Sequence, residues 1–317
     1  MSPVEPGSRR LFGVSVRSEI PLPLGAAVHD PADVLIAYGA VPGAIENPRS
    51  EGVCFMARPD ALLLSVGGVA RYFVEGGARV TVERAAGSTE DEVRLFLLSS
   101  AFAALVHQRR MLPLNGTAIV AGGDAVVFAG APALGKTTLA AGLLGKGYAL
   151  LSDDLCAVSL DAAGRPVVHP GLPQVKLWAN SLRELGHDAG ALRPVRPGVA
   201  KYLMPVQERF HGEAARLRSI YILKETTDTG FSVERIAGFD ATVAVNGITY
   251  RPAFLGGPHP PTRDDLRGEP WASHLERVMA IAARCSLTEV TRPSRGFRLE
   301  ELAALIEADF NAGRAGQ

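Results

Sequence analysis

Residues 130–137 read GAPALGKT, and this stretch decides how the rest of the chain is interpreted. It matches the pattern G-x-x-x-x-G-K-[ST], in which the backbone N–H groups of a glycine-rich loop hold phosphates. The apolar run 125–129 before it is typical of a buried strand, and residues 137–144 after it have apolar side chains at helical spacing. A polyphosphate can satisfy the unpaired N–H groups of such a helix start. The stretch therefore predicts nucleotide binding, the alternative being a glycine-rich turn with a chance lysine.

Within this loop, Lys136 is expected to neutralise the β- and γ-phosphates, and the Thr137 hydroxyl to ligate Mg²⁺. ATP and Mg²⁺ are accordingly the predicted cofactors. Pro132 has no N–H to offer a phosphate. Ala133 stands where glycine is common, which requires backbone angles that tolerate a Cβ. The predicted nucleotide-binding residues of the loop are Gly130, Ala133, Leu134, Gly135, Lys136, Thr137 and Thr138.

Composition narrows the class of protein. The 317 residues are enough for one large domain or two ordinary ones. The hydrophobic content of 47% and charged content of 21% indicate a globular protein and argue against a disordered one. The formal net charge is zero. Because neutrality removes the general attraction to nucleic acid or anionic lipid, no nucleic-acid and no membrane partner is expected.

The three cysteines, Cys54, Cys156 and Cys285, lie far apart and form neither a metal-binding pattern nor a disulfide framework, which favours a reducing compartment. Arg9-Arg10 is not followed by the apolar stretch of a signal peptide, so no signal peptide is expected. No apolar run approaches the length of a membrane span. A cytoplasmic location is therefore expected.

The pattern along the chain changes near residue 88. Residues 1–87 carry strand and turn signals, with strands expected at 61–66, 71–74 and 79–82 and a hairpin turn at 75–78. We interpret 1–87 as a β-rich accessory domain and 88–317 as the nucleotide-binding domain. The second begins with Thr89 and Glu92, a capping-box pair, and a helix that ends near residues 109–110.

The second region predicts an α/β fold. Strands at 117–120 and 125–129 precede the loop, and the loop helix is followed by a strand at 148–151. A helix between two apolar strands predicts a parallel pair with a right-handed crossover. The long segment 251–270 is rich in proline, glycine and charge, which makes it a candidate lid or acceptor-recognition segment. Further elements are expected as strands at 217–223, 231–236 and 287–290 and helices at 271–284 and 299–309.

Asp153 and Asp154 end the strand that follows the loop helix. At this edge of nucleotide-binding folds, a carboxylate holds Mg²⁺ directly or through water. Neighbouring carboxylates on a strand end point in different directions, so one is expected to face the metal and the other the reacting phosphoryl group. A carboxylate beside an acceptor hydroxyl can act as general base. The alternative is a strand-end turn without a catalytic role.

Taken with the Asp-Asp strand end, GAPALGKTT resembles the HPr serine kinase/phosphorylase superfamily, whose fold is related to that of phosphoenolpyruvate carboxykinase. The chain is most similar to stand-alone HPr-kinase-like proteins found near peptide-modification genes, including kinases of lasso-peptide precursors. The resemblance covers most of the chain from about residue 60. It implies an α/β P-loop core of the HPr-kinase/phosphoenolpyruvate-carboxykinase type in 88–317, with a small β-rich N-terminal domain. Other matching stretches are VARYFVEGGARVTVE, HQRRMLPLN, HPGLPQVKLW and KYLMPVQERF.

The resemblance also implies roles for individual residues. Asp154 would be the general base, acting with Lys136 in catalysis, and Asp153 would join Thr137 at the metal or support it from behind. Lys176 and Lys201 fall at basic positions from which they could reach the phosphates of the nucleotide. The alternative is that these two lysines only pack their stems against a neighbouring aromatic ring.

Asn115 is a departure, because family members usually have a histidine there. Asparagine can donate a hydrogen bond to a carboxylate but cannot carry a proton at neutral pH.

The predicted function is an ATP- and Mg²⁺-dependent kinase that transfers the γ-phosphoryl group to a hydroxyl, a serine of a peptide or small protein. The alternatives are a nucleotide-binding regulator or scaffold with weak or no catalysis, and a small-molecule kinase. The acceptor and the oligomeric state, a homo-oligomer included, stay open.

Overall fold

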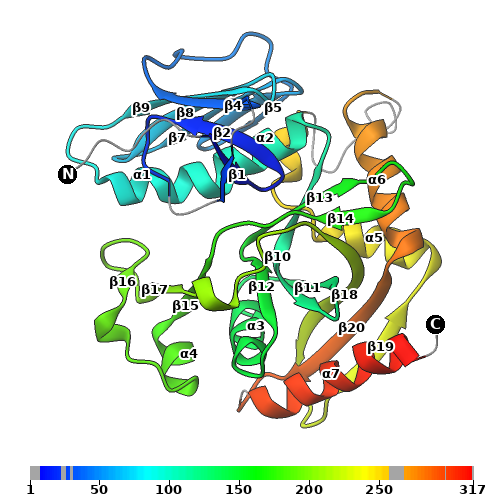
Figure 1. Ribbon diagram of the computed structural model, residues 1–317. Coiled ribbons are helices and arrows are strands. Elements are labelled where there is room, and N and C mark those ends of the chain that lie inside the picture. The colour runs from blue at the N-terminus through cyan, green and yellow to red at the C-terminus, as the bar shows by residue number, and fades with distance from the viewer. Residues whose placement is uncertain (1–7, 23–25, 29–30, 257–267, 297, 316–317) are drawn as a thin grey trace.

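The computed structural model describes residues 8–22, 26–28, 31–256, 268–296 and 298–315. The chain has a mixed α/β fold, as expected, and its described strands form a nine-stranded, an eight-stranded and a three-stranded sheet (Figure 1). No helix in these ranges is both long and apolar enough to cross a bilayer.

The nine-stranded sheet is formed by the N-terminal part of the chain, in the order β3-β1-β2-β4-β9-β8-β7-β6-β5. The three strands and the hairpin turn predicted there are confirmed: β7, β8 and β9 pair antiparallel, and Ala78 N–H donates to Glu75 O across the turn, at 3.1 Å. The strands are β1 (Ser8–Leu11), β2 (Val14–Ser18), β3 (Ala26–Val28), β4 (Val34–Tyr38), β5 (Ser50–Gly52), β6 (Phe55–Arg58), β7 (Ala61–Val66), β8 (Ala70–Glu75) and β9 (Arg79–Arg84).

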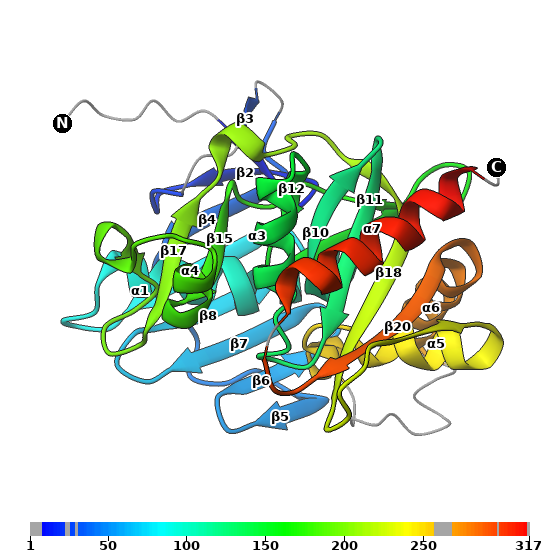
Figure 2. The same cartoon turned by 90° about the horizontal axis from the view of Figure 1, so that it is seen from below.

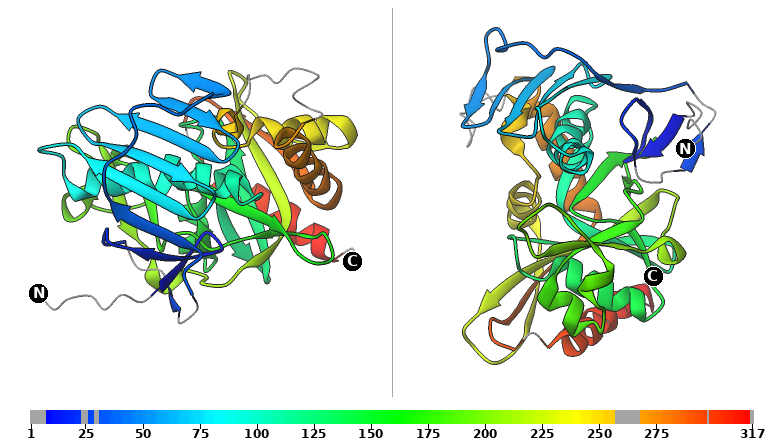
Figure 3. Two further views of the ribbon diagram at one scale, coloured as in Figure 1. Left: turned by 90° about the horizontal axis from the view of Figure 1, so that it is seen from above. Right: turned by 90° about the vertical axis from the view of Figure 1, so that its left-hand side faces the viewer.

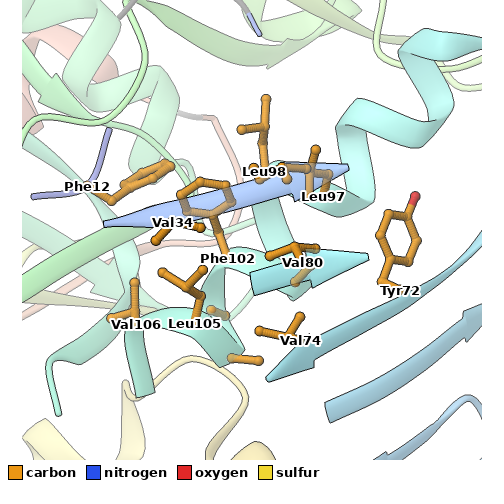
Figure 4. Packing of buried hydrophobic residues seen from close by; sticks show 14 of the residues in the cluster. Phe12, Val34, Tyr72, Val74, Val80, Leu97, Leu98, Phe102, Leu105 and Val106 are labelled. Carbon is orange, nitrogen blue, oxygen red and sulfur yellow. The ribbon is translucent and has the colours of Figure 1, made fainter. Parts of the chain in front are cut away.

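A long helix follows, as α1 (Glu90–Phe96), a π-helical segment (Leu97–Ala101) and α2 (Phe102–Gln108). The predicted capping box is confirmed, because the Thr89 side chain accepts from Glu92 N and the Glu92 carboxylate accepts from Thr89 N. Apolar side chains of this helix pack on the nine-stranded sheet. Figure 4 shows Phe102 and Leu105 of the helix in one core with Val74 and Val80 of the sheet.

Figure 3 shows the sheet as one layer that covers this helix. The same core includes Leu155 and Ala157, which belong to the eight-stranded sheet. The division of the chain at residue 88 stays a prediction, and the structure adds that the helix after it shares a core with the sheet before it.

The glycine-rich loop lies in the eight-stranded sheet, between β11 (Asp124–Gly130) and α3 (Lys136–Gly145). β11 and β12 (Ala149–Ser152) both pair antiparallel with β10 (Leu112–Ala121). The two strands are therefore parallel to each other, but β10 lies between them, and the predicted parallel pair of direct neighbours is wrong. The reason is the turn at residues 122–123, which folds β10 back along β11 and fills the place that β12 would need.

The rest of this sheet follows the order β11-β10-β13-β14-β18-β20-β19, with a second, parallel contact between β11 and β18. The predicted strands at 217–223, 231–236 and 287–290 and the helices at 271–284 and 299–309 are confirmed, with shifted ends for all but the first helix. The sequence analysis missed α5. The elements are β13 (Leu155–Leu160), β14 (Pro166–Val168), β18 (Ala215–Thr226), β19 (Ser232–Ile236), α5 (Gly238–Gly247), α6 (Trp271–Arg284), β20 (Ser286–Pro293) and α7 (Leu299–Ala315).

Strand β11 is apolar on both faces because both faces are covered. Ala125, Val127 and Ala129 belong to a core with residues of α5 and α6, whereas Val126 and Phe128 belong to a core with α3 and α7. This alternation follows from the two-residue period of a strand. Figure 2 shows α3 and α7 on the face turned toward the viewer.

A small three-stranded sheet, ordered β15-β17-β16, lies beside α3. It contains both lysines that the sequence analysis placed near the nucleotide. Its elements are β15 (Gln174–Trp178), α4 (Ala179–Glu184), β16 (Arg193–Pro194) and β17 (Lys201–Pro205), with 3₁₀ turns at Ala189–Ala191 and Gln207–Arg209. In the proposed lid segment 251–270, a 3₁₀ turn covers Pro252–Leu255, and residues 257–267 lie outside the described part of the chain.

Candidate active site

The glycine-rich loop depends on two glycines. Gly130 has φ of 132°, and a Cβ there would come within 2.6 Å of the Leu223 carbonyl oxygen on β18. Gly135 caps α3 with φ of 86°. Both positions have left-handed or extended positive φ, which side-chain-bearing residues rarely adopt. The loop can therefore pass close to β18 and turn directly into the helix.

Ala133 lies between them with φ of 68°. The left-handed conformation costs a residue with a Cβ about 1–2 kcal/mol. The condition that the sequence analysis set for Ala133 is thus met only at the expense of backbone strain. Strain of this kind is concentrated at binding and catalytic sites.

Lys136 folds its side chain back over the loop. Its Nζ donates to the carbonyl oxygens of Gly130, at 2.9 Å, and Ala131, at 2.8 Å. Burial lowers the pKa of Lys136, and the carboxylates of Asp154 and Asp153 oppose that shift. Both acceptors of the ammonium group are neutral carbonyl oxygens, so the anionic oxygens of a phosphate could take their place.

Asp153 receives hydrogen bonds from three donors. Its Oδ1 accepts from the hydroxyls of Thr137, at 2.9 Å, and Thr117, at 2.7 Å, and its Oδ2 accepts from the backbone N–H of Lys176, at 2.9 Å. Burial and the charge of Asp154 raise the pKa of Asp153, and the hydrogen bonds from Lys176 and Thr117 oppose this. The network fixes the Thr137 hydroxyl at the first turn of α3.

Asp154 is the central residue of a tight turn. Its φ is 67°, and Leu155 N–H donates to Asp153 O at 2.9 Å. This is the rarer of the two γ-turn forms, and it is strained. The turn sends the two carboxylates apart, because Asp153 bonds toward α3 and β15 whereas Asp154 Oδ2 accepts from Lys176 Nζ, at 2.7 Å.

The ion pair between Asp154 and Lys176 is asymmetric in exposure, since the Lys176 side chain is 14% exposed and the Asp154 side chain 36%. Burial opposes ionisation of Asp154, but Lys176, Lys201 and Lys136 outweigh it, and the pKa of Asp154 is lowered. Burial likewise disfavours the Lys176 ammonium, but Asp154 and Asp153 raise its pKa. Asp154 is therefore an ionised carboxylate at neutral pH with part of its surface open to the cleft.

Lys136, Thr137, Asp154 and Lys176 line a cleft of about 860 Å³. Lys201 borders it with its Nζ 5.8 Å above the centre of the Trp178 ring, and Thr138 donates to Ser181 Oγ at 2.9 Å. Such a volume is ordinary for a small-molecule site. The predicted residues that border this cleft are Ala133, Gly135, Lys136, Thr137, Thr138, Asp154, Lys176 and Lys201.

Three predicted residues do not border the cleft. Asp153 lies behind Thr137, to which it is hydrogen-bonded. Gly130 and Leu134 border a second cavity of about 820 Å³ on the opposite side of the loop. The carbonyl of Leu134 accepts from Arg292 Nε at 3.3 Å. Asn115 and Pro132 border both cavities, and no side-chain hydrogen bond of Asn115 is formed within the described ranges.

Arg251 also borders the cleft, and the sequence analysis did not single it out. It has left-handed angles, φ 55° and ψ 51°, and its guanidinium lies 5.5 Å above the centre of the Tyr250 ring. Two hydrogen bonds fix the backbone of the preceding residue, Tyr250. Its N–H donates to Pro113 O at 2.8 Å, and its carbonyl oxygen accepts from His107 Nε2 at 2.9 Å. The only signal in the sequence was its place at the start of the proposed lid segment.

A protein-only metal cage is absent from the described ranges, where no group of three or more His, Cys, Asp or Glu side chains could hold a metal ion. Mg²⁺, however, commonly takes one or two protein oxygens and completes its shell with water and substrate phosphates. The Thr137 hydroxyl and the Asp153 carboxylate, 2.9 Å apart, provide hard oxygen donors of that type. These residues fit Mg²⁺ brought by a nucleotide.

Comparison with known proteins gives little beyond this geometry. No family model matches the chain, and no curated protein matches it either. Among solved structures, the chain is similar to the HPr(Ser) kinase/phosphatase from Coxiella burnetii, at 12% sequence identity and a TM-score of 0.30, with 64% of this chain and 97% of that chain covered. This is a distant structural similarity, too distant to say what this chain binds or does.

Proposed function

We propose that the chain is an ATP- and Mg²⁺-dependent kinase with a P-loop core, which transfers the γ-phosphoryl group of ATP to a hydroxyl. The observation that carries this proposal is the convergence of Lys136, Thr137 and Asp154 at one cleft, with Asp153 bonded to the Thr137 hydroxyl. A cation, a hydroxyl on a helix start and two divergent carboxylates are the groups that phosphoryl transfer requires. Phosphoryl transfer depends mainly on positioning and charge stabilisation, and these groups are held in place by hydrogen bonds.

Each group has a separate task in this proposal. The loop N–H groups and Lys136 bind the triphosphate, and Lys136 exchanges its two carbonyl partners for phosphate oxygens. Thr137, held by Asp153, would hold Mg²⁺, which when bound neutralises charge on the phosphates. Asp154 accepts a hydrogen bond from the acceptor hydroxyl and orients its oxygen toward the γ-phosphorus. As transfer proceeds, Asp154 receives the proton that the hydroxyl loses.

Lys176 has a positioning role in this scheme rather than a phosphate-binding one. Its ammonium bonds to Asp154 Oδ2 at 2.7 Å, which leaves Oδ1 for the acceptor. Lys201 and Arg251 have no ion-pair partner within the described ranges and supply positive charge to the same cleft. We infer that the acceptor is a serine of a peptide or small protein. Support for this inference comes from the motifs shared with HPr-kinase-like proteins.

A nucleotide-binding regulator is the second candidate, and Pro132 and Asn115 favour it. Pro132 removes one N–H from the loop, and Asn115 cannot titrate where related proteins have a histidine. Such a protein would bind ATP with the same residues and transfer nothing. The two candidates differ only in the fate of the γ-phosphate.

The test combines ATP binding with a transfer assay on serine-containing peptides, read by mass spectrometry for an added phosphate. Lys136→Ala should abolish ATP binding, whereas Lys146→Ala, at the other end of α3 and paired with Glu307, should leave it unchanged. Asp154→Asn should bind ATP within about threefold of the parent and lose transfer by roughly 10²–10⁴-fold. An Asp154→Asn protein with undiminished transfer would overturn the kinase assignment, and ATP binding without any transfer by the parent would favour the regulator.

A further inference from the structure

The second cavity, between β18, β19 and α5, shares a border with the cleft that contains Asp154. Asn115 and Pro132 line both. Asn115 lies next to the carboxylate turn, because it pairs with Leu155 and because the N–H of the following residue, Gly116, donates to Asp154 O at 3.4 Å. A ligand in the second cavity that continues past Asn115 therefore comes to the residue proposed as general base.

The charge of the cleft matches phosphate. Lys201 and Arg251 have no ion-pair partner within the described ranges, and the Lys136 ammonium is bonded to carbonyl oxygens. The cleft volume of about 860 Å³ lies within the usual range for small-molecule sites. The nucleotide of the proposed reaction is therefore matched to the cleft, and the second cavity remains for the other substrate.

Two glutamates lie side by side in the wall of the second cavity. Glu234 of β19 is directly opposite Glu289 of β20. Like charges in that position repel each other. Lys224 of β18 pairs with Glu289 at 2.7 Å, whereas Glu234 has no ion pair in the part of the chain that the structure describes. A cation supplied by a ligand would remove this repulsion.

The rest of the border adds negative charge. Asp240 of α5 also has no ion pair among the described residues. Arg235 is the other cation at the border, and its guanidinium bonds to Asp309 of α7 at 2.8 Å, on the face of the sheet away from α5. The charge left unpaired in the second cavity is therefore negative, which disfavours phosphate and favours a cationic ligand.

Apolar surface continues from the second cavity onto the outside of α5. Ile222, Ile236 and Val243 line the cavity. Phe239 lies one turn before Val243 on the same face of the helix, and these two side chains are 79% and 53% exposed. Contiguous exposed apolar surface marks sites of protein interaction. A peptide can cover the outside of the helix and the cavity together, with apolar and cationic side chains in one chain.

We propose that the second cavity docks a segment of the acceptor that carries cationic side chains next to apolar ones, outside the reacting serine. The cations bond to Glu234 and Asp240, the apolar side chains cover Val243 and Phe239, and the chain continues past Asn115 into the cleft. This inference rests on the proposed function, because it takes the docked peptide to be the phosphate acceptor. It adds a preference for cationic over anionic acceptor sequences.

Binding of two labelled peptides to the full chain, measured by fluorescence anisotropy without ATP, tests the docking site directly. The peptides have equal length and a single serine. In one, lysine alternates with leucine on both sides of the serine, and in the other glutamate replaces each lysine. The lysine peptide should bind roughly tenfold more tightly or better, and added salt should weaken its binding. Equal binding of the two peptides, or binding of neither, would overturn the inference.

Charge variants locate the bound peptide. Glu234→Gln combined with Asp240→Asn should weaken binding of the lysine peptide roughly tenfold. The matched control combines Glu208→Gln with Glu213→Gln. It removes two exposed carboxylates that also lack ion pairs within the described ranges, in the segment before β18, whereas the cavity borders the last part of that strand. This control should bind within about twofold of the parent, and equal effects of the two double variants would contradict the inference.

The apolar part of the surface has its own matched pair of variants. Val243→Ser should weaken binding of the lysine peptide roughly threefold, because it removes an apolar contact. Val53→Ser makes the same change at an exposed position of the nine-stranded sheet region and should leave binding unchanged. Since both valines are exposed, neither variant threatens folding. An unchanged affinity in Val243→Ser would exclude α5 from the docking surface and overturn the inference.

MgATP separates this inference from the proposed function. The lysine peptide should still bind at saturating MgATP, and its displacement would place peptide and nucleotide in one site and refute the second cavity as the docking site. In the transfer assay, Glu234→Gln with Asp240→Asn should raise the KM for the lysine peptide roughly tenfold and leave kcat within about twofold. An unchanged KM would contradict the inference alone. A parent that binds the lysine peptide but phosphorylates neither peptide would refute the proposed function and the acceptor role together.

Discussion

Acidification should destabilise the protein through one buried histidine. His107 of α2 is 4% exposed, and its Nε2 must carry the proton because its partner, the Tyr250 carbonyl, can only accept. Its Nδ1 has no hydrogen-bond partner within the described ranges. Protonation would place a second donor at Nδ1 without an acceptor, beside the positive charge of Arg277. Burial therefore lowers the pKa of His107 from 6.5 to about 4, the Tyr250 bond opposes the shift, and Arg277 adds to it.

The sign and size follow from the two pKa values. Below pH 6.5 the unfolded chain binds a proton that the folded chain refuses until about pH 4, so stability is lost as the pH falls through this window. The full loss is about 3 kcal/mol, because a difference of one between the two pKa values corresponds to about 1.4 kcal/mol. Between pH 7.5 and pH 5.0 the contribution of His107 is about 2 kcal/mol.

Urea unfolding of the parent and of His107→Gln at these two pH values measures this contribution. Glutamine can still donate to the Tyr250 carbonyl but does not titrate. The loss of unfolding free energy on acidification should be smaller in the variant by about 2 kcal/mol, whatever other groups contribute to both proteins. Equal losses in the two proteins, within about 0.5 kcal/mol, would refute the reasoning.

Three further predictions concern the cleft. Thr137→Val keeps the shape of the side chain and removes the hydroxyl that Asp153 holds, so half-maximal ATP turnover should require a higher Mg²⁺ concentration, whereas Thr137→Ser should behave as the parent in a Mg²⁺ titration. Ala133→Gly removes a strain of about 1–2 kcal/mol and adds an entropic cost of about 0.5–1 kcal/mol, so urea unfolding should show a net gain near 0.5 kcal/mol; a net loss would mean that the loop is not strained in solution. Arg251→Ala removes a cation that borders the cleft and should lower kcat at least about a hundredfold while ATP binding changes less than about threefold, and an unchanged kcat would remove Arg251 from the reaction.

The parts of the structure that could be predicted from the sequence are those set by local sequence patterns. The glycine-rich loop, the capping box of Thr89 and Glu92 and the helix Trp271–Arg284 each depend on residues within a few positions of one another. The two carboxylates were placed at the end of the strand after the loop helix, and the structure has them there. Their roles as base and metal partner stay predictions.

The parts that were missed depend on distant contacts. Helix α5, with the sequence GFDATVAVNG, begins and ends in glycine and lacks a polar stripe, so its periodicity indicates no helix. The turn at residues 122–123 places β10 beside β11, but the pairing of β12 with β10 is set across the sheet and not by any single stretch. Arg251 borders the cleft next to Tyr250, whose backbone is hydrogen-bonded to Pro113 and His107, far earlier in the chain.

Strand β10 determines how precisely the parts of the site are positioned relative to one another. The loop is joined to it through β11, the carboxylate turn through β12, and the segment before Arg251 through the bonds of Asn115 and Pro113 to residues 248 and 250. All three parts therefore take their positions from one common reference, and small displacements do not accumulate from element to element. Thermal motion of β10 carries the loop, the carboxylates and the arginine together, so their mutual spacing varies less than the position of any one of them.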